Sequence, residues 1–320
     1  MGPGFTDSHV HFWDASLRRY PWLSAFPEIA GPHGPGDLMR EAAGSPPSRI
    51  VFVQADCERG SAMDEVGWVE SLAAHTPQIS GIVAFAPMDA GPGTAMALDA
   101  LRSRPLVRGV RHLIQGEPDP GFCLTPAFLE GVRRCGELGL SFDLCVRHPQ
   151  LSAVVELARL CPGTSLVLDH AGKPDLRSNV LDPWRRHIAQ LAECPNVACK
   201  VSGLVTEAGT AALDPERFVP TISHLLETFG PTRLLYGSDW PVIKLASPYP
   251  TWLTMARALF AHLPAPGQAA VFGGTAARVY RLAASLATGP RMHRIDGRTP
   301  LRIDGGRSPA TQPHAHDHRA

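Results

Sequence analysis

Short apolar segments recur along this chain, and each one after the first is followed by a segment with the character of a helix. The strand-like segments cover residues 7–13, 49–55, 79–87, 106–114, 141–147, 165–170, 197–203 and 233–239. Helix-like segments follow at 64–75, 93–104, 125–138, 149–160, 182–193, 215–229 and 249–261. Strands that alternate with helices are typical of parallel α/β folds. Eight alternations in 320 residues predict a (β/α)8 TIM barrel rather than a doubly wound sheet.

Three segments fall outside this alternation. Residues 14–48, rich in Pro and Gly, predict an irregular loop with a short helix over the barrel mouth. Residues 268–286 predict a last helix that packs on the outside of the barrel. From residue 289 the chain is polar and lacks hydrophobic periodicity. We therefore expect one domain over residues 1–288 and a disordered tail over residues 289–320.

Composition narrows the classes of partner. The 30 basic and 30 acidic residues balance, which argues against nucleic-acid and membrane partners. No stretch is apolar enough to span a bilayer, and the start of the chain lacks the pattern of a signal peptide. The seven cysteines are scattered singly, which indicates reduced, mostly buried thiols and a cytoplasmic location.

The first strand carries a His-x-His pair, His9 and His11. Alternate residues of a strand point to the same face, and these two lie about 7 Å apart at Cα, so both imidazoles can reach one metal ion or one substrate oxygen. Asp239, at the end of the eighth strand, offers the oxygen ligand or general base that two histidines lack.

Active sites of such barrels gather at the C-terminal ends of the strands. Polar residues stand at these ends: Gln54 and Asp56, Arg111 and His112, Arg147 and His148, Asp169 and His170, Lys200 and Ser202, and Asp239. Cationic and imidazole groups around a carboxylate predict a site for an oxygen-rich ligand. Lys200 points either into the barrel or towards a helix, depending on a one-residue register.

In these residues the chain resembles the amidohydrolase superfamily, and within it the amidohydrolase-2 branch that contains the sugar-lactone hydrolases. The resemblance covers roughly residues 5–285. It is carried by DSHVHFWD (7–14), YPWL (20–23), VQA (53–55), VRGVRH (107–112), FDLCVR (142–147), LDHAGKP (168–174) and YGSDWPV (236–242).

The resemblance implies a hydrolase that opens the cyclic ester of an aldonolactone in carbohydrate catabolism. Asp239 would activate water, while His9, His11 and His170 would bind a metal or polarise the carbonyl. A zinc ion held by His9, His11 and Asp239 would lower the pKa of its bound water towards about 7. Branch members differ in whether they need the metal, and this chain leaves that open.

Substrate contacts are expected from six further residues. Hydrogen bonds to ring hydroxyls and the carbonyl are assigned to Gln54, Arg111, His112, Arg147 and Lys173. Trp240 is expected to stack against an apolar sugar face or to pack the barrel mouth. The partner is thus a small molecule, and a homo-oligomer is left open.

The chain departs from the superfamily pattern in two places. Its fourth strand has no lysine or acid that would bridge two metals, so at most one metal ion is expected. Thr275 replaces an asparagine in the end motif, kept here as TAARVY (275–280), where we expect a structural role.

Two other function classes are compatible with a barrel of this kind. A zinc-dependent decarboxylase of an aromatic or muconate-type acid would share the barrel, the His-x-His pair and the final aspartate. A non-catalytic barrel would be expected to lose Asp239 or a first-strand histidine, and all three are present.

Overall fold

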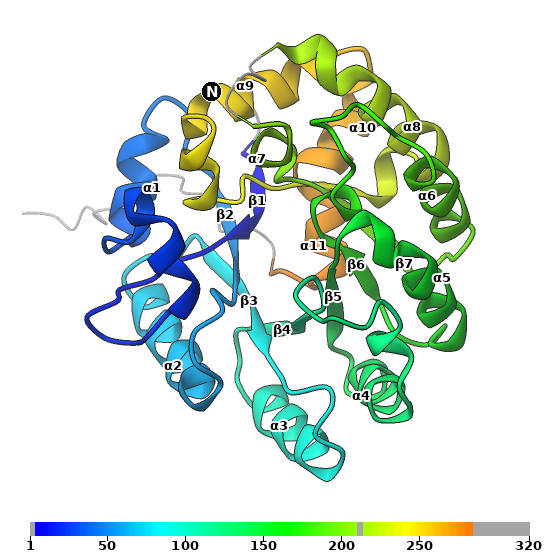
Figure 1. Ribbon diagram of the computed structural model, residues 1–320. Helices are drawn as coiled ribbons and strands as arrows, with labels where there is room; N and C mark the ends of the chain where they lie inside the picture. The colour runs from blue at the N-terminus through cyan, green and yellow to red at the C-terminus, as the bar shows by residue number, and fades with distance from the viewer. Residues whose placement is uncertain (1–3, 210–213, 284–320) are drawn as a thin grey trace, which may run out of the picture. The chain divides into compact units, whose positions relative to one another are not determined.

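The computed structural model describes residues 4–209 and 214–283, so the predicted tail 289–320 lies outside the described residues. Eight parallel strands form one sheet in the order of the sequence (Figure 1). They are β1 (Thr6–Val10), β2 (Arg49–Val53), β3 (Ile79–Phe85), β4 (Val107–Leu113), β5 (Ser141–Cys145), β6 (Leu166–Leu168), β7 (Val197–Val201) and β8 (Leu234–Tyr236). The predicted (β/α)8 barrel is confirmed.

The helices cover the outer face of the sheet or lie at the ends of the barrel (Figure 1). They are α1 (Pro35–Glu41), α2 (Ala62–Ala73), α3 (Pro92–Arg102), α4 (Pro126–Glu137), α5 (Leu151–Leu160), α6 (Trp184–Ala192), α7 (Leu204–Ala208), α8 (Val219–Phe229), α9 (Tyr249–Leu259), α10 (Ala265–Ala269) and α11 (Thr275–Val279). The long segment after β1 contains α1 and two 3-10 turns, Pro21–Ala25 and Pro27–Ile29. A loop with a short helix was predicted there.

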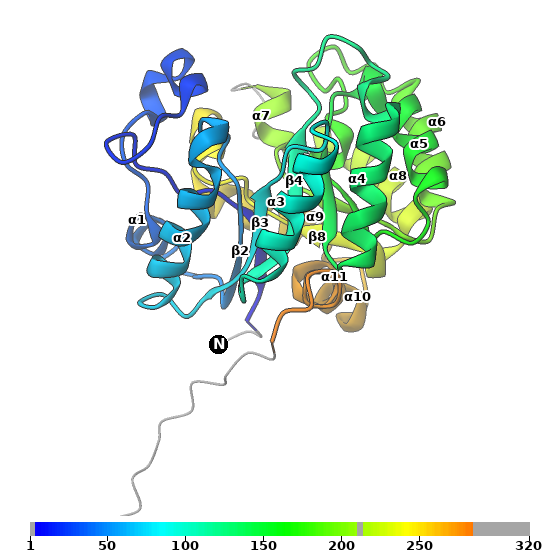
Figure 2. The same cartoon turned by 90° about the horizontal axis from the view of Figure 1, so that it is seen from below.

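The last helix differs from its prediction. We expected residues 268–286 to pack on the outside, but α10 and α11 lie across one end of the barrel, opposite α7 (Figure 2). Ala276, Val279 and Tyr280 join a buried cluster with inward-facing strand residues, so α11 plugs the barrel from below. Its small and apolar side chains fit this narrow end, which sequence periodicity alone does not distinguish from an outer helix.

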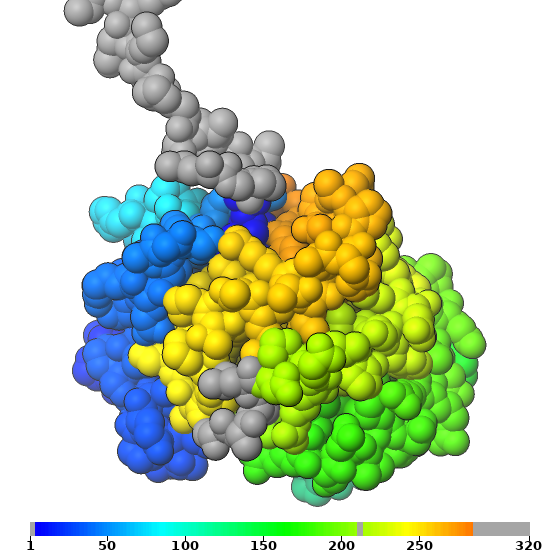
Figure 3. All heavy atoms as spheres, turned by 90° about the horizontal axis from the view of Figure 1, so that it is seen from above, coloured from blue at the N-terminus to red at the C-terminus, as the bar shows by residue number. Residues whose placement is uncertain are grey.

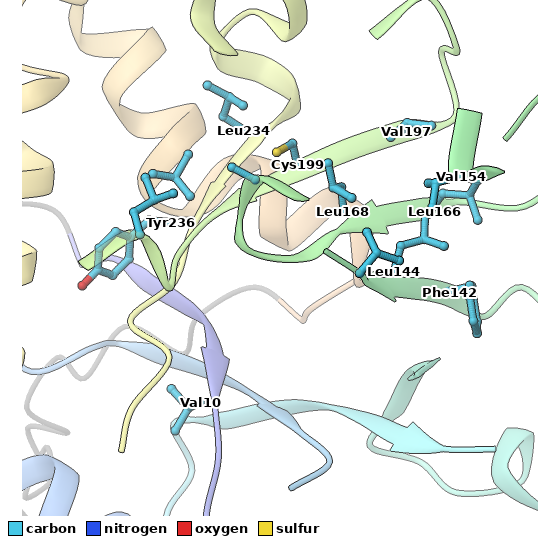
Figure 4. Packing of buried hydrophobic residues seen from close by; sticks show 14 of the residues in the cluster. Val10, Phe142, Leu144, Val154, Leu166, Leu168, Val197, Cys199, Leu234 and Tyr236 are labelled. Atoms are coloured by element: carbon cyan, nitrogen blue, oxygen red, sulfur yellow. The ribbon is translucent and has the colours of Figure 1, made fainter. Parts of the chain in front are cut away.

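The strand residues divide between two cores because successive side chains point to opposite faces. One face contributes Val51, Val53, Val83, Val167, Ala198 and Leu235 to the barrel interior. The other face packs under the helices, as Leu144, Leu168, Cys199 and Leu234 do in Figure 4. Polar side chains in the interior therefore need partners there, because no water-exposed face is available to them.

Direct contacts join β1 to the segment after β8. The His11 backbone N–H donates to the Trp240 carbonyl at 2.7 Å, and the Asp239 N–H donates to the His9 carbonyl at 2.9 Å. The buried Asp7 carboxylate accepts from the Ser238 N–H at 2.9 Å and from the Tyr249 hydroxyl at 3.1 Å. These bonds bring the two ends of the sheet together and place the first-strand histidines beside Asp239.

The N-terminal end of β1 meets the segment that leads into α11. Figure 3 shows the first described residues (dark blue) beside the segment of α10 and α11 (orange). No helix in residues 4–209 or 214–283 is both long and apolar enough to cross a membrane. All seven cysteines are buried and have free thiols.

Candidate active site

Two histidines and one carboxylate meet where β1 and β8 end. The Nε2 atom of His11 lies 3.3 Å from Oδ1 of Asp239, and Nε2 of His9 lies 3.6 Å from the same oxygen. All three side chains are at least nine-tenths buried. The structure thus brings together the His-x-His pair and the final aspartate, as the sequence predicted.

The outer ring nitrogens of these histidines are held by acceptors. Nδ1 of His11 lies 2.7 Å from the Val53 carbonyl oxygen, and Nδ1 of His9 lies 3.3 Å from Oδ1 of Asp169. An Nδ1–H that donates to an oxygen leaves Nε2 with its lone pair, the form in which histidine binds metals. Burial lowers the pKa of His9 well below its ordinary value, which favours this neutral ring.

His170 reaches the centre from the turn Asp169–Gly172 after β6. Its backbone is left-handed, with φ of 54°, and its Nδ1 lies 2.9 Å from the Ser202 hydroxyl. Gly203 packs so closely that a Cβ there would lie 2.6 Å from the same nitrogen. Burial lowers the pKa of His170 to about 4, so the ring is neutral at pH 7.

Asp239 is also held in a left-handed conformation, with φ of 64°. Non-glycine residues adopt this region at a cost that is repaid where function fixes a side chain. Burial alone would raise the pKa of Asp239, but His170, His11 and His9 lower it below its ordinary value. The group is therefore a carboxylate at neutral pH.

This donor set fits a divalent metal ion. The nearest ligand atoms of His9, His170 and Asp239 lie within 4.8 Å of one another. The sequence predicted His9, His11 and Asp239 as ligands, and Nε2 of His11 approaches the same carboxylate oxygen. Nitrogen donors with a carboxylate oxygen, each held by a further hydrogen bond, are the usual composition of a catalytic metal site.

Arg111 lies next to this centre on the inner face of β4. Its guanidinium is 3% exposed and contacts Oδ2 of Asp169 at 3.1 Å, the Gln54 carbonyl oxygen at 2.6 Å and Nε2 of His9 at 3.4 Å. The Gln54 side-chain Nε2 is buried and has no hydrogen-bond partner within the described residues. Gln54 and Arg111 therefore place N–H donors beside the histidines.

Lys173 and Arg147 lie further out. The ammonium group of Lys173 donates to Oε1 of Gln115 at 2.6 Å and pairs with Glu207 at 3.5 Å. Both residues border a pocket of about 390 Å³ that is also lined by His148, Pro149, Pro174, Asp175, Arg177 and Glu207. Burial lowers the pKa of Lys173, but the Cys145 thiol and the carboxylates of Glu207 and Asp239 hold it above its ordinary value, so the side chain remains a cation.

Two predicted substrate contacts lie apart from this group. His112 faces away from the barrel interior; its ring packs near Phe85, Phe122 and Phe128, and its Nδ1 accepts from the Met88 N–H. This follows from strand alternation, since Arg111 takes the inner face.

Trp240 is fully buried, with its ring near Phe12 and His33 and its indole N–H donating to Glu41 at 2.9 Å. It therefore packs the wall of the barrel mouth and presents no surface to a sugar. Packing was one of the two roles the sequence left open for this residue.

The sequence named Lys200 and Asp169 at strand ends but did not single out Asp143 and Tyr280, which join them in a layer beneath the histidines. Lys200 points into the barrel, where Nζ lies 2.6 Å from Oδ2 of Asp143, 3.0 Å from Oδ1 of Asp169 and 3.2 Å from Nδ1 of His9. The Tyr280 hydroxyl donates to Oδ2 of Asp143 at 2.7 Å. A charged residue in the middle of an apolar strand, as at 143 and 200, is the signal that points to such a layer.

The chain is similar to known proteins over most of its length. A sequence model of the family described as Amidohydrolase matches residues 6–282. The chain is 34% identical to L-fucono-1,5-lactonase of Burkholderia multivorans, over 88% of this chain and 97% of that protein. It is 31% identical to L-fucono-1,5-lactonase of Burkholderia ambifaria, over 86% and 95% of the two chains.

A crystal structure of a zinc-bound amidohydrolase from Burkholderia multivorans has the same fold. Its TM-score is 0.80 at 34% identity, over 88% of this chain and 100% of that one. The extent of these matches, together with the histidines and aspartate at the strand ends, shows that the chain belongs to the amidohydrolase family.

Proposed function

We propose that this hydrolase opens the cyclic ester of a sugar-acid lactone, an aldonolactone, to give the open-chain acid. Asp239 activates the attacking water, and His9, His11 and His170 bind a metal ion or polarise the carbonyl. The observation that carries the proposal is the buried Asp239 carboxylate, which faces the Nε2 atoms of His9 and His11. The lactonase relatives support the choice of a cyclic ester as substrate.

Asp239 has the properties of a general base for this reaction. Its position next to the imidazoles keeps it ionised, and its fixed backbone aims it at one point. Taking a proton from water makes the water nucleophilic as it attacks the carbonyl carbon. The same proton then passes from Asp239 to the ring oxygen when the C–O bond breaks, so that the leaving group departs as an alcohol.

The developing oxyanion needs donors on its other side. Arg111 supplies a buried guanidinium 3.4 Å from His9, and Lys173 supplies a second cation from the turn after β6. A zinc ion bound by His9, His11 and Asp239 would add a Lewis acid at the same place. Without the metal, the N–H groups of these side chains stabilise the oxyanion by themselves.

Substrate hydroxyls are assigned to Gln54, Arg147 and Lys173. Gln54 offers a buried amide N–H that lacks a partner within the described residues, and such a group is expected to bind a polar ligand atom. Arg147 and Lys173 line the adjoining pocket. His112 and Trp240 support the walls behind these residues, because both are buried among aromatic side chains.

The test is proton release by the purified protein on a panel of aldono-1,4- and 1,5-lactones, before and after chelation. Rapid hydrolysis of one lactone supports the proposal, and the chelated sample reports on the role of the metal. No proton release on any lactone of the panel, with metal present, would refute the proposed lactonase activity. Release of carbon dioxide from an aromatic or muconate-type acid would then support the decarboxylase instead.

A further inference from the structure

A chain of buried hydrogen bonds and ion pairs crosses the barrel interior from Tyr280, just after α11, to the catalytic centre. It runs from the Tyr280 hydroxyl to Asp143, then to Lys200, Asp169 and the His9 ring. Each of these side chains is buried, with 0% exposure for Tyr280, Asp143, Lys200, Asp169 and His9. The reaction as proposed above uses only His9, so the remaining groups need a separate explanation.

We propose that Lys200 and Tyr280 are positioning residues that hold the His9 ring, by direct contact of Lys200 and through Asp169, in the orientation required at the catalytic centre. The inference rests on the proposed function only in taking His9 as part of that centre. It gives the tyrosine of the TAARVY end motif a role beyond packing of the last helix.

Asp169 and Lys200 both contact the His9 ring directly, and Lys200 Nζ lies 3.2 Å from its Nδ1. Oδ1 of Asp169 lies 3.3 Å from Nδ1 of His9, while its Oδ2 accepts from Arg111 at 3.1 Å. Lys200 binds the first of these oxygens at 3.0 Å. Two cations on different oxygens fix the plane of the Asp169 carboxylate, and thereby the surface against which the His9 ring lies.

The Lys200 side chain is flexible, so it needs contacts that fix it in one conformation. Its Nζ lies 2.6 Å from Asp143 and 5.4 Å from the centre of the Tyr280 ring. Four rotatable bonds make a lysine costly to order, and a buried ammonium is stable only when its donors are used. Asp143 takes one donor, and the Tyr280 hydroxyl fixes the oxygen that accepts it.

The buried charges of Lys200, Asp143 and Asp169 are not explained by stability alone. Replacing a buried ion pair with apolar residues is often neutral or stabilising, so charge in the interior is a poor device for stability. The neighbouring interior positions Val53, Val167 and Leu235 show that this barrel can be filled with apolar side chains. The charged residues are confined to the layer that touches His9.

The test compares Lys200→Met and Tyr280→Phe with two matched controls. Lys244→Met removes a lysine that pairs with a carboxylate on the surface, Glu41. Tyr236→Phe removes a buried hydroxyl that has no partner within the described residues. The affinity for Zn²⁺ is measured by competition with a chromophoric chelator, which needs no substrate and is therefore independent of the proposed reaction.

Lys200→Met is expected to weaken Zn²⁺ binding about 10- to 100-fold, as loss of an outer hydrogen-bonding group does at other metal sites. Tyr280→Phe is expected to weaken it by up to about fivefold, the effect of roughly one hydrogen bond. Both controls should bind like the parent. Unchanged or tighter Zn²⁺ binding in Lys200→Met would overturn the proposal. Removing a nearby positive charge favours a bound cation, so weaker binding is expected only if the His9 ring loses its orientation.

A second readout serves if Lys200→Met does not fold or if metal uptake is weak in every sample. In ¹⁵N-histidine-labelled protein, the Nδ1 proton of His9 should shift in Tyr280→Phe. The Nδ1 proton of His11, bonded to Val53, should stay in place and is the internal control. An unmoved His9 resonance in that variant would contradict the inference even if the lactone assay succeeds.

Discussion

The His11 imidazole and the Asp239 carboxylate meet at 3.3 Å although 228 positions separate them in the chain. The contact exists because β1 and the segment after β8 are joined by backbone hydrogen bonds on both sides of it. Barrel closure and the assembly of the catalytic centre are therefore the same structural event.

Asp239→Asn removes the base and changes little volume. We expect kcat for the lactone to fall by about 10²- to 10⁴-fold, the usual contribution of a general base. Asparagine tolerates the left-handed backbone at this position, so the circular dichroism spectrum and the unfolding midpoint should stay close to those of the parent. A variant that keeps more than a few per cent of the activity would remove Asp239 from the mechanism.

His9→Ala combined with His11→Ala should abolish binding of the divalent metal, since both Nε2 atoms that face Asp239 are lost. The control is His112→Ala, which removes a buried imidazole that faces away from the barrel interior. Metal content per protein is measured after incubation with Zn²⁺ and gel filtration. One equivalent retained in the double variant would place the metal elsewhere.

Gly203→Ala tests the support behind His170. The new Cβ would lie 2.6 Å from Nδ1 of His170, and the left-handed φ of 65° adds backbone strain. Gly139→Ala is the matched control, because it has φ of 67° and open space around the added carbon. Both should lose about 1–2 kcal/mol of stability from the backbone, measured by urea unfolding.

Only Gly203→Ala should also lose activity, because it alone displaces a catalytic ring. Equal kcat values in the two variants would show that the position of His170 does not limit the reaction. An unfolding free energy that is unchanged in both variants would mean that the backbone relaxes at each site without cost.

The outline of the barrel could be predicted from sequence because strand and helix signals are local. The segments 79–87 and 106–114 fall on β3 and β4 with boundaries that differ by one or two residues. The His-x-His pair was equally readable, since both members share one face of one strand. These features need no knowledge of what packs against them.

The remaining features depend on tertiary geometry. Whether Lys200 or its neighbours face the barrel interior depends on a strand register that no local sequence pattern fixes. For the same reason, the sequence does not tell which of Arg111 and His112 faces inward. The inward position of α11 was missed because its apolar face gives the same periodicity inside or outside the barrel. The left-handed backbone at His170 and Asp239 likewise arises from contacts between strands.

Glu65 makes stability depend on pH, away from the catalytic centre. This residue of α2 is 1% exposed, its Oε1 accepts from the Ala55 N–H at 3.3 Å, and burial raises the pKa of its carboxyl to about 7. A raised pKa means that the unfolded chain releases this proton at lower pH than the folded chain. The contribution of Glu65 to the free energy of unfolding is therefore complete below about pH 4.5 and is lost as the pH rises through 7.

Glu65→Gln keeps a side-chain oxygen that can accept the hydrogen bond from the Ala55 N–H, and it removes the titratable carboxyl group. Its free energy of unfolding relative to the parent should rise between pH 5 and pH 8 by at most about 3 kcal/mol, the upper limit set by a shift of roughly two and a half pKa units. Urea unfolding at both pH values measures this difference, and Glu28→Gln on the surface controls for the exchange itself. A difference that is constant with pH would show that Glu65 is ionised in the folded barrel, and that Ala55 and nearby cations offset the cost of its burial.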